Sequence, residues 1–504
     1  WTLPQGKGGF SPPLAKVPPT LPALAPLAPS RWQINGWRLI DAPQVRTAGA
    51  ELSRPGTDVA RWYPATVPGT VLTTLIDRGV YPDPFYGLNN MAIPEKLARQ
   101  DYWYRATFKV PSEANGKALR LQFGGINYAA QIWINGRQAG STKGAFTRGS
   151  FAFDAVPGEN VVAVLVSPPP HPGIPHEQSI TGGVGENGGQ LAIDGPTFVA
   201  TEGWDWIPGI RDRNTGLWQP VELLATGAVR LLDPRVVTDL PLPRLDSADI
   251  HIDVPLSNDG PAPRRVTVTA AFGDVRVSRT LDLPPGETTV RFTPALDPAL
   301  RIANPKLWWP NGYGEPALHT LALAVVTDGT ESDRKSLRFG IREVSYELSL
   351  FDSSGKLRRV EVDPTDGTLR GERLVDVRHV AIKQTPEGWT ESLTAAGETS
   401  PAVRDIAASY ALPHLALRVN GVRIAARGGS WGMDDALKRV SRDRLAPYFR
   451  LEREAHMNII RNWMGNNSEP EFYDLADENG MMVLNDFWQS TQDFQVEPQD
   501  PALF

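Results

Sequence analysis

The chain has 504 residues, of which 41% are hydrophobic and 21% are charged, and its formal net charge at pH 7 is −6. This composition excludes a chain that is disordered throughout, and the absence of a dense Lys/Arg run argues against a nucleic-acid partner. No purely apolar run exceeds that at 161–166, which is too short to cross a membrane. Without any cysteine, the chain has no disulfide, thiol nucleophile or thiolate metal site.

Glycine, proline and tryptophan are all frequent. Glycine and proline number 46 each, which favours many short strands joined by turns. The 15 tryptophans are core residues first, but a flat indole ring is also the preferred platform for the apolar face of a pyranose. The composition therefore indicates a β-rich protein and is compatible with sugar binding.

The first 30 residues contain eight prolines. Because proline fixes φ and removes a hydrogen-bond donor, residues 1–30 are predicted to be an extended arm and not a packed element. The arm is either a flexible tail or a segment laid over the surface of a later domain.

Residues 31–227 are predicted to form an all-β domain. Apolar and polar residues alternate over strand-length runs that are separated by Asn-Gly or Gly-Gly turns, and residues 132–136 give a strong hairpin signal. The Gly-rich stretch 168–189 has no periodicity and should be a long loop, which in a compact domain is usually functional or disordered. It leads into the sequence EGWDWIP at 202–208.

Residues 228–342 show turn signals every eight to twelve residues, which is typical of an immunoglobulin-like β-sandwich. The following stretch, 343–412, contains hairpin and loop material. We interpret it as an insertion of uncertain fold.

The pattern of hydrophobic residues changes in residues 413–504. Strand and helix patterns alternate there, and this alternation predicts an α/β unit with parallel strands. The expected order is strand, helix, strand, helix and strand, at 423–428, 441–456, 458–464, 470–478 and 481–486.

No fourth strand is visible before Phe504. Because parallel sheets need cover on both faces and neighbours at both edges, we expect that the chain does not act alone. The expected partner is the missing C-terminal part, supplied either by a second chain or by a longer form of this one.

A collinear series of stretches resembles glycoside hydrolase family 2. The resemblance implies a multidomain β plus α/β protein, with a jelly-roll (galactose-binding-like) domain at 31–227, the immunoglobulin-like sandwich, and the first part of a (β/α)8 TIM barrel at 413–504. The stretches that carry it are VPGTVLTTLIDRG (67–79), YPDPFYG (81–87), DYWYRATF (101–108), FGGINYAAQIWINGRQAG (123–140), LWWPNGYGEPALHTL (307–321), FGIRE (339–343), RVNGVRIAARGGSW (418–431) and the long run 456–488.

Within the family, EGWDWIPGIRDRNTGLWQPV (202–221) and the preceding HPGIPHE resemble the plant-type endo-β-mannosidases that cut Manβ1-4GlcNAc in N-glycans. The stretch is also similar to exo-acting β-mannosidases and exo-β-glucosaminidases. The resemblance implies a retaining hydrolase of β-mannosidic bonds in N-glycans or other mannose-containing oligosaccharides, with no cofactor and a periplasmic or secreted location. Two alternatives stay open: an exo-β-glucosaminidase and a non-catalytic carbohydrate-binding chain.

The catalytic carboxylates are not found in this sequence. A retaining glycosidase needs two carboxyl groups about 5–5.5 Å apart, and in this family the resemblance places them on a Glu after an Asn at the fourth barrel strand and on a Glu at the seventh. No Asn-Glu dipeptide occurs in the chain. The catalytic glutamates are therefore expected beyond residue 504, and the chain alone is expected to be inactive.

Half of a sugar pocket is expected at the carboxyl ends of the three predicted strands, because barrel active sites lie there. The resemblance gives Arg461 the task of keeping the nucleophile ionised, and gives Asp205 that of accepting hydrogen bonds from sugar hydroxyls. The alternatives are a structural ion pair for Arg461, a helix N-cap or loop hydrogen bond for Asp486, core packing for the tryptophans and a solvated Asp205. The predicted substrate-binding residues are Trp204, Asp205, Trp431, Arg461, Asn462, Trp463, Asp486 and Trp488, and the histidines His171 and His176 are predicted to be loop residues without a metal.

Overall fold

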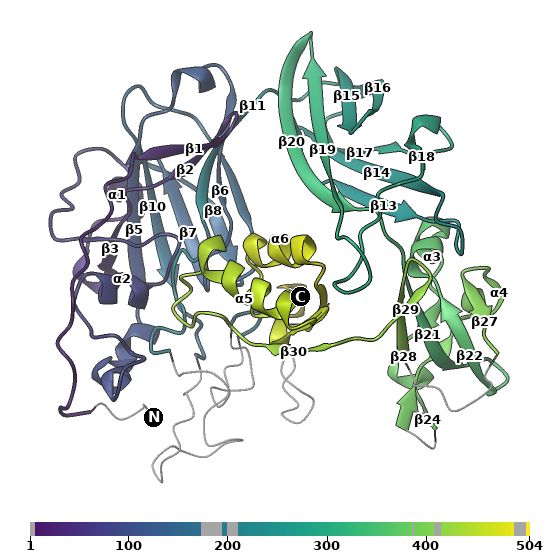
Figure 1. Ribbon diagram of the computed structural model, residues 1–504. Coiled ribbons are helices and arrows are strands. Elements are labelled where there is room, and N and C mark those ends of the chain that lie inside the picture. Colours follow the sequence, from purple (N-terminus) through teal and green to yellow (C-terminus); the bar gives the residue numbers. More distant parts are fainter. Residues whose placement is uncertain are drawn as a thin grey trace.

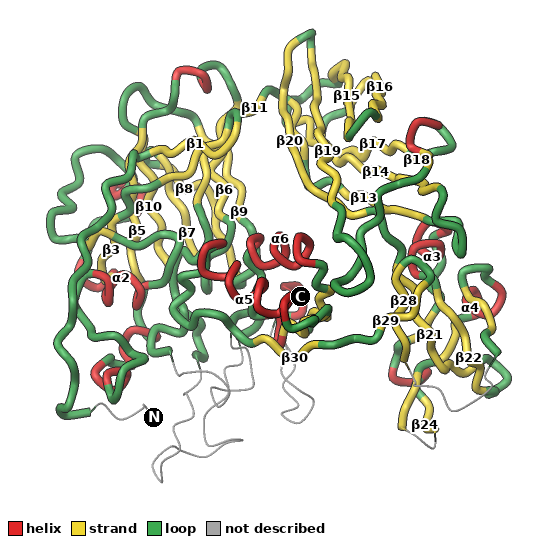
Figure 2. The backbone as a smooth tube through the Cα atoms, viewed as in Figure 1, coloured by secondary structure: helices red, strands yellow, loops and turns green. Residues whose placement is uncertain are grey.

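The computed structural model describes most of the chain, and every statement below refers to this part: residues 6–172, 194–198, 210–385, 388–407, 415–487 and 500–503. Strands dominate these residues; helices α5 (Arg442–Glu454) and α6 (Pro470–Asn479) lie near the middle of the molecule, and shorter helices lie at its sides (Figure 2). None of the described helices is long and apolar enough to cross a membrane.

The first domain consists of two antiparallel sheets packed face to face around one apolar core. One sheet has the order β1 (Leu24–Ala28), β2 (Arg31–Ile34), β11 (Val221–Thr226), β6 (Ala118–Phe123), β9 (Gly149–Phe153). The other has the order β4 (Tyr63–Pro64), β3 (Arg38–Asp41), β5 (Tyr102–Phe108), β10 (Asn160–Ser167), β7 (Ala129–Ile134), β8 (Arg137–Lys143). Two short helices, α1 (Gly49–Leu52) and the fully buried α2 (Val71–Asp77), complete the domain.

The proline-rich arm lies along the first domain. The backbone N–H of Lys16 donates to the carbonyl oxygen of Asp77 over 2.8 Å, and the Lys16 ammonium pairs with the Asp77 carboxylate. The backbone N–H of Ser11 donates to the side-chain oxygen of Asn89 over 2.9 Å. The described part of the arm is thus laid over a domain surface, and its last residues form the edge strand β1.

The second domain is a β-sandwich with its own core. In one sheet, β14 (Ser247–Asn258) pairs with β12 (Val229–Leu231), β13 (Arg235–Asp239), β17 (Gly286–Phe292) and β18 (Arg301–Ala303). The other has the order β16 (Val275–Leu283), β15 (Arg264–Phe272), β19 (Leu318–Thr327), β20 (Thr330–Gly340). The long strands alternate buried and exposed residues, as expected where one face of each sheet is solvated.

A third sheet occupies most of the stretch that we interpreted as an insertion of uncertain fold. Its strands are β21 (Val344–Phe351), β22 (Leu357–Val362), β23 (Val375–Asp376), β26 (Ser392–Leu393), β27 (Val403–Asp405), β28 (Leu415–Val419) and β29 (Val422–Ile424). Helices α3 (Pro364–Arg370) and α4 (Ala395–Thr399) and the hairpin β24 (Lys383–Thr385) with β25 (Gly388–Thr390) flank it. The β28–β29 hairpin joins this sheet because β28 pairs with β21.

The C-terminal part forms a parallel unit. Its three-stranded sheet has the order β30 (Gly428–Trp431), β31 (Ile459–Asn462), β32 (Met482–Asn485), and helices α5 (Arg442–Glu454) and α6 (Pro470–Asn479) connect the strands. Helix α6 ends at Gly480, which adopts the left-handed conformation that favours glycine. The predicted alternation is present for both helices and for the second and third strands. The position predicted for the first strand, 423–428, was wrong: residues 422–424 form β29 of the third sheet, and the first parallel strand is the four-residue β30 that begins at Gly428.

The parallel unit is held between the first domain and the sandwich (Figure 1). Met433, Ala436 and Leu437, from the loop after β30, are buried in the core of the first domain. On the other side, the indole N–H of Trp308 donates to the carbonyl oxygen of Asp477 and the backbone N–H of Asn311 to that of Gly480, both over 2.8 Å. Both neighbours thus fix the position of the parallel sheet.

Candidate functional site at the edge of the parallel sheet

The two faces of the parallel sheet differ in their surroundings. Trp431, Ile460 and Val483 point to the face where α5 and α6 pack, and they belong to the apolar cluster between sheet and helices. Ser430, Arg461 and Leu484 are neighbours in register, one on each strand, and belong to the opposite face by the alternation of side chains along a strand. Leu484 is 57% exposed, so this second face is open in the described part of the chain.

Arg461 and Asp486 form an ion pair on the open face. The Nε of Arg461 lies 3.1 and 3.0 Å from the two carboxylate oxygens of Asp486, and Nη2 lies 2.7 Å from Oδ2. Asp486 follows β32 and stands two residues after Leu484, on the same face. Their side chains are 45% and 23% exposed, so a fixed cation and a fixed carboxylate are presented at the carboxyl edge of the sheet.

Asn462 joins the end of β31 to the next strand and to the following loop. Its side chain is fully buried, and its amide donates to the carbonyl oxygen of Asn467 and to Oδ1 of Asn485, both over 2.7 Å. Its Oδ1 accepts from the backbone N–H of Asn467 over 3.1 Å. Since these partners are protein groups, Asn462 fixes the end of β31 to β32 and to the following loop.

The described tryptophans of the predicted pocket have different environments. The ring of Trp431 packs 5.1 Å from Phe449 and 5.3 Å from Phe472, on the helix side of the sheet, as a core ring does. Trp463 is half-buried and begins a short 3-10 turn after β31. A substrate-binding role for either tryptophan stays a prediction.

Several predicted residues lie outside the described residues: Trp204, Asp205, Trp488 and His176. His171 is described, and its Nδ1 lies 3.2 Å from Oδ1 of Asp194. Among the described ranges, no group of three or more His, Asp or Glu side chains is arranged to hold a metal ion.

The structure also contains a buried ion pair that the sequence did not reveal. Lys438, in the loop after β30, pairs with Glu469, which directly precedes α6. Their side chains are only 1% and 5% exposed. No spacing or motif marks these residues, because the pair forms between two separate loops.

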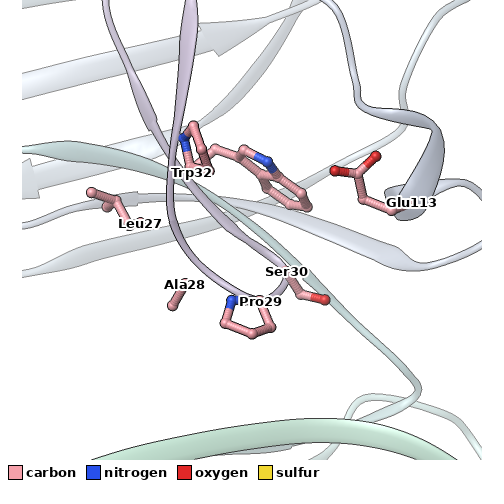
Figure 3. Close-up of a pocket in the computed structure, with 7 residues that line it drawn as sticks. Leu27, Ala28, Pro29, Ser30, Trp32 and Glu113 are labelled. Carbon is pink, nitrogen blue, oxygen red and sulfur yellow. The ribbon is translucent and has the colours of Figure 1, made fainter.

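A shallow pocket of about 500 Å³ lies elsewhere, on the edge of the first domain (Figure 3). It is lined by the turn between β1 and β2, by Trp32 and by Glu113. Glu113 is the single carboxylate in this lining, whereas a retaining glycosidase needs two. The candidate site is therefore the edge of the parallel sheet.

Comparisons with known proteins agree with this arrangement. Residues 44–219 match the family model described as the glycosyl hydrolase 2 galactose-binding domain-like family, and residues 229–342 match that of glycosyl hydrolases family 2. A mannosylglycoprotein endo-β-mannosidase from Lilium longiflorum is 30% identical over 476 residues, which are 90% of this chain and 42% of that protein. An exo-β-D-glucosaminidase from Streptomyces avermitilis is 29% identical over 480 residues, covering 93% of this chain and 42% of that protein.

A solved exo-chitosanase from Amycolatopsis orientalis has the same fold. It superimposes with a TM-score of 0.64 at 24% identity, over 90% of this chain and 43% of its own. The chain thus spans less than half the length of these relatives.

The two matched models together span more than half of the chain, and the collinear matches run through all of its described domains. They confirm the galactose-binding-like first domain and the sandwich that were expected from the sequence. The chain belongs to glycoside hydrolase family 2.

Proposed function

We propose that the protein containing these residues is a retaining glycoside hydrolase that acts on β-mannosidic bonds, in N-glycans or in other mannose-containing oligosaccharides. The observation that carries the proposal is the Arg461–Asp486 pair, which lies on the open face at the carboxyl edge of the parallel sheet. Barrel enzymes bind and cleave their substrates at this edge. A periplasmic or secreted location stays a prediction.

The open face is, in this proposal, the interior of a (β/α)8 barrel. The order β30, α5, β31, α6, β32 is two repeats of a strand–helix unit with parallel strands. Parallel sheets are covered on both faces, and both helices of this unit contact one face. The remaining strands and the two catalytic glutamates would come from a further part of the protein, in the same chain or a second one, so these residues alone would be inactive.

Arg461 would act on a catalytic carboxylate. A cation within a few ångströms lowers the pKa of a carboxyl group and keeps it ionised for nucleophilic attack. Asp486, 2.7 Å away, would hold the guanidinium in the orientation that the reaction needs. The first domain would contribute Trp204 and Asp205, and the strand ends Trp463 and Trp488, as rings and acceptors for the sugar.

An exo-β-glucosaminidase is the second candidate, because relatives with that activity match the chain over a similar length. Glucosamine carries a cationic amino group at neutral pH, which needs a carboxylate that is not already neutralised. Two described carboxylates near the strand ends, Asp486 and Glu469, are each paired with a protein cation. This pairing favours a neutral sugar such as mannose.

The decisive experiment measures hydrolysis of an aryl β-mannoside and of chitosan oligomers by the complete enzyme. We expect the mannoside to be hydrolysed with retention of the anomeric configuration and without added metal. Strict preference for chitosan would replace the proposal with the second candidate. Binding of mannosides without turnover of either substrate would support a non-catalytic carbohydrate-binding protein.

A further inference from the structure

Lys438 and Glu469 form an ion pair between two loops of the parallel unit. Lys438 lies in the loop after β30, and Glu469 ends the loop after β31. Apart from this ion pair, the carboxylate oxygens of Glu469 have no hydrogen-bond partner among the described residues. Because a buried charge without its partner is strongly unfavourable, the position of Glu469 depends on the Lys438 ammonium.

The same ammonium contacts the first domain. It lies 4.5 Å from the ring centre of Phe198 and 5.0 Å from that of Trp218, and the two rings are perpendicular to each other. A cation over the faces of desolvated aromatic rings is attracted by their electron density. One side chain therefore joins the first domain to both loops at the edge of the parallel sheet.

The backbone of Lys438 supports a specific role for this position. Its φ is +53°, in the left-handed backbone region that residues other than glycine, asparagine and aspartate seldom adopt. Such a conformation persists where the surrounding contacts determine it. Here the neighbouring carbonyl oxygen of Leu437 accepts a hydrogen bond from Oγ1 of Thr73 over 2.5 Å, and so fixes the loop against the first domain.

The loop that ends with Glu469 is connected to the strand that carries Arg461. Asn467 donates its side-chain amide to the carbonyl oxygen of Gly432 over 2.9 Å, and its backbone N–H to Oδ1 of Asn462 over 3.1 Å. Asn462 is the last residue of β31, directly after Arg461. A displacement of the loop would therefore be transmitted to the guanidinium.

We propose that Lys438 is a positioning residue for the glycosidase reaction. Its ammonium, enclosed by Phe198, Trp218 and Glu469, sets the edge of the parallel sheet against the first domain and so aligns Arg461 with the substrate groups that the first domain binds. This inference rests on the proposed function.

The test uses three variants of the complete enzyme. Lys438→Met leaves a buried carboxylate unpaired, so this variant is expected to lose both stability and activity. The double variant Lys438→Met/Glu469→Gln removes both charges and is expected to regain a melting temperature near that of the wild type. Lys335→Met is the matched control, because Lys335 pairs with Asp233 in the sandwich at 3.1 Å, away from the site.

The double variant shows whether Lys438 positions Arg461 for the reaction or only contributes to stability. We expect its kcat/KM to stay at least ~10-fold below the wild type, with the loss mainly in kcat, because misalignment affects the transition state more than ground-state binding. A double variant with restored stability and wild-type kcat/KM would overturn the inference. The control is expected to keep wild-type kinetics.

A second measurement keeps the inference separate from the proposed substrate. The kinetic ratio is taken on whichever glycoside the wild type cleaves, so a preference for chitosan would alter the proposed function alone. If the wild type cleaves neither substrate, hydrogen exchange of the double variant decides. We expect faster exchange in residues 459–469 and unchanged exchange in 264–272, whereas unchanged exchange in both would overturn the coupling.

Discussion

Arg461 on β31 and Asp486, directly after the neighbouring parallel strand β32, bring Nη2 and Oδ2 to 2.7 Å on the face that α5 and α6 leave open. Their geometry is that of a bidentate contact, in which two guanidinium nitrogens approach one carboxylate. Such a contact fixes the orientation of the guanidinium group. In the proposed barrel, this face would line the space where the substrate binds.

Replacing Arg461 with Met should reduce the activity of the complete enzyme. A hydrogen bond to a charged group contributes ~1.5–3 kcal/mol, so its loss at the site should lower kcat/KM at least ~10-fold. Steady-state kinetics on the aryl β-mannoside provide the measurement. The control is Arg265→Met, which removes an exposed ion pair of the sandwich, and equal kinetics of both variants would argue against a role for Arg461.

Asp205→Ala should also lower kcat/KM of the complete enzyme by at least ~10-fold, since a carboxylate that accepts from sugar hydroxyls contributes a comparable free energy. Asp205 lies outside the described residues, so its role rests on the family resemblance. We expect an unchanged melting temperature. Wild-type kinetics together with that unchanged temperature would remove Asp205 from the site.

Trp431→Ala should destabilise the parallel unit. The partly buried ring packs against Phe449 and Phe472. Truncating a fully buried aromatic side chain costs about 3–5 kcal/mol, which is the upper limit here. Trp431→Phe should keep most of this packing. Urea unfolding measures both variants, while a loss of substrate affinity at unchanged stability would instead indicate that Trp431 binds the sugar.

The stability of the sandwich should depend on pH through two carboxyl groups at its border with the third sheet, Asp239 and Glu343. Burial raises the pKa of Asp239 to about 6, with repulsion from Asp363 as the next cause. Burial also raises the pKa of Glu343, which forms a side-chain hydrogen bond with Asp363. Protonation of Asp239 and Glu343 is therefore linked to folding.

The direction of this pH dependence follows from the raised pKa values. A carboxyl group with a raised pKa stabilises the folded state below its ordinary pKa, and this contribution is lost as the pH rises through the folded-state value. For Asp239 the loss should occur from about pH 4 to about pH 6. Asp239→Asn should flatten the fall in melting temperature over this window, whereas Asp282→Asn, at an exposed position, should leave it unchanged. A parallel fall in Asp239→Asn and the wild type would contradict the assignment.

The sequence predicted those features that local patterns encode. Alternation revealed the strands of the first domain, and the helix predicted at 470–478 corresponds to α6. Partners distant in the chain were not encoded locally, so residues 423–424, predicted as part of the first parallel strand, belong instead to the β28–β29 hairpin, which pairs with β21 through β28. The four-residue strands β30 and β31 are also too short for periodicity to show which face carries Trp431 and which carries Arg461.

The sequence could predict that Arg461 and Asp486 lie close together, because the carboxyl ends of consecutive parallel strands lie side by side. The Lys438–Glu469 pair was not, since each residue lies in an irregular loop and the pair is enclosed by rings from a third segment.

The burial of Met433, Ala436 and Leu437 in the core of the first domain has a consequence for the modularity of this protein. A homologous first domain grafted onto this chain would meet a loop shaped for a different core, and its own core would lack three apolar side chains. Domain exchange between relatives should therefore succeed only when residues 432–440 are transferred together with the first domain. During synthesis, the same contact means that the first domain completes its core only after the ribosome has made a segment more than two hundred residues downstream.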